Sequence, residues 1–139
     1  MIAPTLFVGI GGTGSKLVAR LEKRNRHSKE NIGYVVFDTD ANELRALKSA
    51  GFTGQVVQTS ANMTVGEYLD EDTKAAEEWF PINKILNRKT LTEGAGQVRA
   101  ISRLAFNATV RAGGMDPLHR EIEKMYKLNG DVMKQSLRV

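Results

Sequence analysis

The first half of the chain alternates short apolar runs with helical patterns. Residues 5–8 and 34–37 are nearly all apolar, which is typical of strands buried in a parallel sheet. Residues 15–24 carry apolar side chains at helical spacing between those strands. A short helix is predicted after residue 40, and a third strand over 55–59. The side chains predicted to face inward on these two helices are Leu17, Val18, Leu21, Leu44 and Leu47.

This β-α-β-α-β order predicts an α/β fold, with a Rossmann-like three-layer α/β/α arrangement. Right-handed crossovers that continue in one direction give a short parallel sheet of strand order 3-2-1. The remainder reads as mostly helical, and further helices are predicted over 72–80, 98–112 and 116–128. The length of 139 residues predicts a single domain, residues 1–139.

A glycine cluster lies between the first strand and the first helix. Gly9, Gly11 and Gly14 fit the pattern G-x-G-x-x-G, whose glycines allow a tight turn, close phosphate approach and helix–strand packing. Free N–H groups and the helix dipole then hold the anion. The predicted phosphate cradle is Gly9, Gly11, Gly12, Thr13, Gly14 and Ser15. Dinucleotide, ATP and GTP folds all share this pattern, and a glycine-rich turn without a ligand is the alternative.

Two other loops are candidates for the same site. Asp38 follows the second strand, and its distance along the chain from the glycine cluster is compatible with the expected spacing of ~20 residues. It is predicted to accept a hydrogen bond from a ribose hydroxyl. Asp40 is assigned to the site as well, although its alternative role is to cap the next helix with Glu43. A second potential anion-binding loop precedes the long helix. The alternative is that this loop only connects two helices. Its residues are Gly94, Ala95, Gly96 and Gln97.

Composition excludes several classes of protein. The chain has no Cys and only two His, so we predict no metal site and no catalytic thiol. Without a membrane-length apolar run or a secretory leader, the sequence predicts a cytoplasmic protein with no membrane partner. The net charge is only +4. The basic cluster Lys23, Arg24, Arg26 and Lys29 is interpreted as a solvated helix end, so nucleic acid is not expected as a partner.

Three more patterns, in the second half of the chain, predict a helix cap, core residues and surface contacts. Thr64 and Glu67 have the spacing of a capping box. An apolar stripe is predicted to be core, and its members are Trp79, Phe80, Ile82, Ile85 and Leu86. Three arginines of the long helix are assigned to surface ion pairs, with the first two worth testing as phosphate ligands; they are Arg99, Arg103 and Arg111.

Together the three loops resemble the tubulin/FtsZ superfamily of GTPases, and most closely the bacterial tubulin-like proteins. Residues 9–15 are similar to the first phosphate loop of FtsZ. Residues 38–41 are similar to its Asn-Thr-Asp-Ala segment, with Asp38 in place of Asn. Residues 91–96 are similar to the loop that holds the terminal phosphates. The resemblance implies a GTP- or GDP-binding module, with or without Mg²⁺, in a protein that self-associates into filaments or other assemblies.

One departure limits what the resemblance implies. The family's Gly-Gly-Gly-Thr-Gly-Ser/Thr-Gly signature is absent, so the likeness is to the N-terminal nucleotide-binding half. We therefore expect a domain truncated before the fourth strand, and GTPase activity only in a full-length protein or polymer. The alternative function is a Rossmann-type NAD- or ATP-binding domain of an oxidoreductase or an adenylating enzyme. Neither alternative predicts the second small-residue loop before the long helix.

Overall fold

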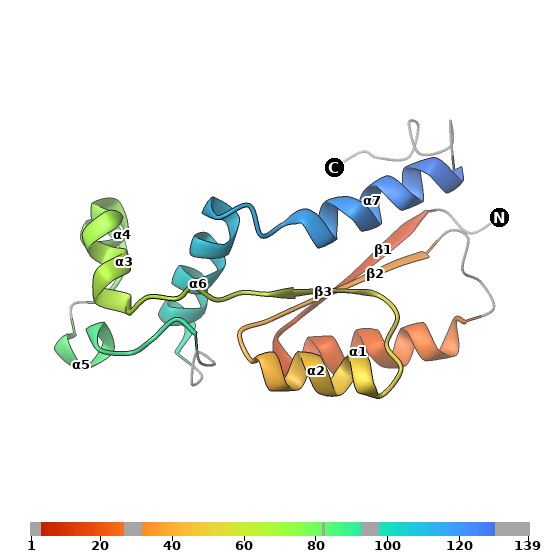
Figure 1. Cartoon of the computed structure of the whole chain (residues 1–139), viewed down its shortest axis with the longest axis horizontal. Coiled ribbons are helices and arrows are strands. Elements are labelled where there is room, and N and C mark those ends of the chain that lie inside the picture. The colour runs from red at the N-terminus through yellow and green to blue at the C-terminus, as the bar shows by residue number, and fades with distance from the viewer. Residues whose placement is uncertain (1–3, 27–31, 82, 93–97, 130–139) are drawn as a thin grey trace. The chain divides into compact units, whose positions relative to one another are not determined.

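The computed structural model describes residues 4–26, 32–81, 83–92 and 98–129. Figure 1 shows the elements, whose order is β1 (Thr5–Ile10), α1 (Gly11–Arg24), β2 (Ile32–Asp38), α2 (Ala41–Ser49), β3 (Gln55–Gln58), α3 (Val65–Glu71), α4 (Thr73–Glu78), α5 (Lys84–Asn87), α6 (Arg99–Arg111) and α7 (Asp116–Asn129). The chain divides into two compact units. The sheet unit comprises Met1–Asp38, Asn42–Val57 and Met115–Val139, and the helical unit comprises Thr39–Ala41 and Gln58–Gly114.

The predicted α/β alternation is present. The sheet has three strands in the order β1-β2-β3, so β2 is central, as it is in the order 3-2-1 read from the other edge. β1 and β2 are parallel, in a register that runs from Thr5 opposite Ile32 to Ile10 opposite Phe37. A central strand has both faces covered, which explains why β2 is a continuous apolar run.

Helices cover both faces of β2. Tyr34 and Val36 pack with Val18 of α1 and Leu44 of α2. Val35 and Phe37 point to the opposite face, as the alternation of a strand requires, and the partly buried Leu118 of α7 packs there. The sheet unit therefore has the predicted three layers, with α1 and α2 on one side and α7 on the other (Figure 1).

The helical unit has its own core. Ile101, Leu104, Ala105 and Ala108 form the buried face of α6, as predicted. The other buried members of this cluster are Val65, Tyr68, Ala75, Phe80 and Leu91. The core is therefore built from α3, α4 and α6 and the segments that join them.

The predicted capping box at the start of α3 is confirmed. The Glu67 N–H donates to Thr64 Oγ1 at 3.2 Å, and the Thr64 N–H donates to Glu67 Oε2 at 2.6 Å. The backbone N–H and the hydroxyl of Thr64 stabilise the carboxylate and lower the pKa of Glu67 below its ordinary value. The cap is therefore complete when Glu67 is ionised.

Two predictions of buried residues are wrong. Leu17 is 59% exposed, because the face of α1 that meets the sheet runs through Ser15, Val18 and Glu22. Ile85 is 75% exposed, since α5 is a single turn and contributes only the partly buried Leu86 to the core. Ile82 lies outside the described residues.

Candidate functional site

The predicted phosphate loop forms the first turn of α1. β1 continues through Ile10, and α1 begins at Gly11 rather than at Ser15. Gly11 has a φ of +71°, a left-handed conformation that favours glycine, so the chain can turn from strand to helix there. The unpaired N–H groups at this site are therefore those of a helix N-terminus, where the helix dipole favours an anion.

Gly9 and Gly14 bring the strand and the helix into close contact. A Cβ atom added to Gly9 would lie 2.6 Å from the carbonyl oxygen of Gly14. A Cβ atom on Gly14 would lie 3.4 Å from the carbonyl carbon of Gly9. The structure thus shows a packing role for this pair, and their assignment to nucleotide binding stays a prediction.

Gly12 and Ser15 have surroundings that suit a ligand. The nearest atom to a Cβ added to Gly12 would be Asp38 Oδ2, at 3.9 Å, so the space beside this glycine is open. Ser15 is only 1% exposed, and its Oγ has no hydrogen-bond partner among the described residues. A buried hydroxyl without a partner costs about 1–3 kcal/mol, and a phosphate oxygen would supply that partner. These residues therefore fit a nucleotide phosphate.

Asp38 ends β2 and is 9% exposed. Its position relative to Gly12 places a carboxylate beside the start of α1, where a ribose hydroxyl could donate to it. Asp40 directly precedes α2, as a capping residue does, and its capping box with Glu43 stays a prediction. Glu43 pairs with Lys16 of α1 at 3.1 Å, an exposed ion pair that the sequence did not predict.

The third predicted loop, Gly94, Ala95, Gly96 and Gln97, lies outside the described residues. Two of the arginines on α6 have contacts within the helical unit. The Arg103 guanidinium lies 3.9 Å from the centroid of the Trp79 ring. Arg111 Nη1 pairs with Asp72 Oδ2 at 3.4 Å, as expected for a surface ion pair.

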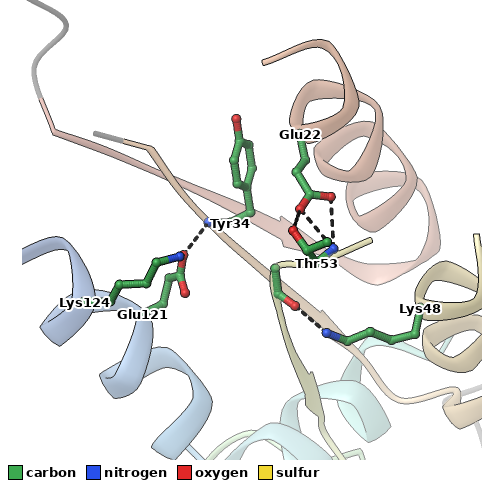
Figure 2. A network of polar contacts seen from close by, with 7 residues as sticks. Glu22, Tyr34, Lys48, Thr53, Glu121 and Lys124 are labelled. Carbon is green, nitrogen blue, oxygen red and sulfur yellow. Dashed lines mark hydrogen bonds and ion pairs between the residues drawn. The ribbon is translucent and has the colours of Figure 1, made fainter. Parts of the chain in front are cut away.

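Sequence reasoning missed two buried carboxylates at the opposite end of α1 (Figure 2). Glu22 accepts hydrogen bonds from the Thr53 N–H, at 3.0 and 3.2 Å to its two oxygens, and from the Thr53 hydroxyl. Glu121 of α7 accepts from the Tyr34 N–H at 3.4 Å and pairs with Lys124 at 3.6 Å. The position of Glu22 one turn after Val18 was the available signal, because it puts Glu22 on the sheet-facing side of α1.

Comparison with known proteins identifies a family for this chain. A family model described as "Tubulin like" matches residues 6–138, which include all three predicted loops. Neither the comparison with curated proteins nor that with solved structures gives a match. In the described part of the chain, none of the helices is long and apolar enough to cross a membrane.

Proposed function

Because the chain belongs to the tubulin-like family, we propose that the N-terminus of α1 binds the phosphates of GTP or GDP. The observation that carries the proposal is the Ser15 hydroxyl, which is buried beside the glycine turn and lacks a hydrogen-bond partner among the described residues. The family match gives no support to the oxidoreductase or adenylating-enzyme alternative.

Each residue of the turn has a distinct role in this proposal. The N–H groups of Gly11, Gly12 and Thr13 donate to phosphate oxygens, and the open side of Gly12 admits the ligand. Ser15 Oγ donates a further hydrogen bond, and Asp38 accepts from the ribose. Asp40 and residues 94–97 belong to the proposed site on sequence grounds alone. Any Mg²⁺ would be held mainly by the nucleotide's own phosphates.

We assign no hydrolytic residue in this chain. GTP hydrolysis is proposed to require a polymer, in a cytoplasmic assembly. The binding step can be tested separately from any hydrolysis.

The first experiment measures nucleotide affinity by calorimetry with GTP, ATP and NAD. We expect GTP to bind and Gly12→Val to abolish binding, because the added side chain fills the open space beside Asp38. Ser15→Ala should weaken binding by roughly tenfold, since hydrogen bonds to charged groups contribute about 1.5–3 kcal/mol. Leu17→Val, an exposed change on the same helix, is the matched control and should leave the affinity unchanged. Tight NAD binding without GTP binding would contradict the proposal.

We also propose self-association through β1. β1 is an edge strand of the described sheet, and residues 5–10 carry no charge that would deter pairing. Val8 and Ile10 are 46% and 76% exposed. The alternative is that residues 135–139 pair with this edge of β1. These residues lie outside the described ranges.

Light scattering at several protein concentrations tests this proposal. We expect the mean mass to rise with concentration and Val8→Lys to restore a monomer, because a charged edge resists strand pairing. Ile85→Lys, at another exposed apolar position, is the control and should still associate. A concentration-independent monomer with slow amide exchange at residues 6–8 would show that the edge is already covered and would contradict the proposal.

A further inference from the structure

A cavity of about 460 Å³ lies in the sheet unit at the end of α1 away from the glycine turn. It is lined by the last turn of α1, the start of β2, residues before β3 and part of α7; the polar side chains that matter are Glu22, Arg26, Tyr34, Thr53, Glu121 and Lys124. Its volume is in the range of sites for small molecules, ~300–1,000 Å³. The proposed nucleotide function makes no use of it.

Glu22 is a buried anion in the wall of this cavity. Its side chain accepts hydrogen bonds from the N–H and hydroxyl of Thr53, which are neutral donors. Among the described residues, no Lys, Arg or His nitrogen pairs with it, although Glu22 is only 5% exposed. A buried charge is costly unless an opposite charge compensates it, so this carboxylate favours a cation in the cavity.

Tyr34 provides a second and independent sign of a ligand. The residue is 7% exposed, and its hydroxyl has no hydrogen-bond partner in the described ranges. The ring stacks on Phe7 with centroids 5.7 Å apart, which holds the hydroxyl in place. Figure 2 shows the Tyr34 ring on the same side of β2 as Glu22. A ligand that donates to the hydroxyl oxygen would satisfy this group.

The other charges narrow the class of ligand. Glu121 already pairs with Lys124, and Arg26 is exposed and donates to the Gly51 carbonyl. Within the described part of the chain, Glu22 is therefore a buried carboxylate of this cavity without an ionic partner. Nowhere in the described residues do three or more His, Cys, Asp or Glu side chains form a group that could hold a metal ion. The ligand is therefore better matched by an organic cation with N–H donors than by a metal.

We propose that this cavity binds a small organic cation through a primary ammonium group. The ammonium donates one hydrogen bond to the Glu22 carboxylate and one to the Tyr34 hydroxyl oxygen. The apolar part of the ligand lies against Ile32 at the start of β2. This site is separate from the glycine turn, so its test is independent of nucleotide binding.

The test uses n-butylamine, which is protonated at neutral pH, with calorimetry and thermal unfolding as readouts. Butylammonium should bind and raise the melting temperature. Three controls should give no comparable effect: n-butanol has the shape without the charge, tetramethylammonium has the charge without N–H donors, and sodium chloride matches the ionic strength. An absence of binding, or an equal response to any control, would overturn the proposal.

Two variants locate the site. Glu22→Gln should abolish butylammonium binding, whereas Glu123→Gln, an exposed change on α7, should leave it unchanged. Tyr34→Phe should weaken binding by about tenfold, because a hydrogen bond from a charged donor is lost. Without the amine, Tyr34→Phe should melt at the same or a higher temperature, since it removes an unpartnered buried hydroxyl. A clearly lower melting temperature of Tyr34→Phe, or an unchanged affinity of Tyr34→Phe for butylammonium, would overturn the proposal even if Glu22→Gln fails to fold. An unchanged affinity of a folded Glu22→Gln variant would overturn it as well.

Discussion

Replacing Gly9 with alanine should destabilise the sheet unit by about 3 kcal/mol, the upper part of the range for overpacking. The added Cβ would lie 2.6 Å from the carbonyl oxygen and 2.8 Å from the carbonyl carbon of Gly14. These are backbone atoms of α1, so relief requires the whole helix to move away from β1 rather than one side chain to rotate. Urea unfolding measures the change in the free energy of unfolding.

Gly12→Ala is the matched control for this prediction. Its added Cβ would have no neighbour closer than Asp38 Oδ2 at 3.9 Å, and Gly12 is in the first turn of α1. We expect its stability to be unchanged or to rise by up to about 1 kcal/mol, because alanine favours a helix over glycine. Equal stability of the Gly9 and Gly12 variants would show that β1 and α1 can separate without loss.

The strands of the sheet unit were predictable because β2 is covered on both faces. An apolar run such as residues 34–37 has few other stable environments, so its place in the sheet follows from the sequence alone. The boundary between β1 and α1 was not predictable to the residue. Gly11 adopts a positive φ and lets the helix begin at once, whereas the sequence pattern suggested a loop as far as Ser15.

The orientation of α1 was only partly predicted. Leu17 and Val18 are both apolar, and sequence alone does not decide which of two adjacent residues is central to the buried face. The answer depends on Gly9 and Gly14, whose close contact fixes the rotation of the helix and turns Ser15 and Glu22 inward. Both buried polar groups therefore result from backbone packing, which a hydrophobic pattern does not encode.

The candidate nucleotide site was predictable in its residue types but not in their roles. The motif assigns the glycines collectively to the ligand, and the structure separates packing by Gly9 and Gly14 from the open position at Gly12. The Ser15 hydroxyl points to a ligand only because it is buried, since an exposed serine hydroxyl would bind water. The Glu22 cavity required residues from distant segments to be brought together, so no local motif indicates it.

Replacing Leu104 with alanine should have a comparably large effect on the helical unit. Leu104 is fully buried in the cluster that contains Tyr68 of α3 and Ile101 of α6. The substitution removes a buried side chain and leaves a cavity, which costs about 2–5 kcal/mol. Urea unfolding gives the loss of stability, and amide exchange should be faster in α3 and α6.

Val110→Ala on the same helix separates a core effect from a helix effect. Val110 is 46% exposed, so little apolar contact is lost, and alanine is the better helix former. Its stability should therefore stay within about 0.5 kcal/mol of the parent protein. If Leu104→Ala were as mild as Val110→Ala, α6 would not be anchored by this core. The arginines it carries, Arg103 over Trp79 and Arg111 paired with Asp72, would then have to hold the helix through partly exposed contacts, which are individually weak.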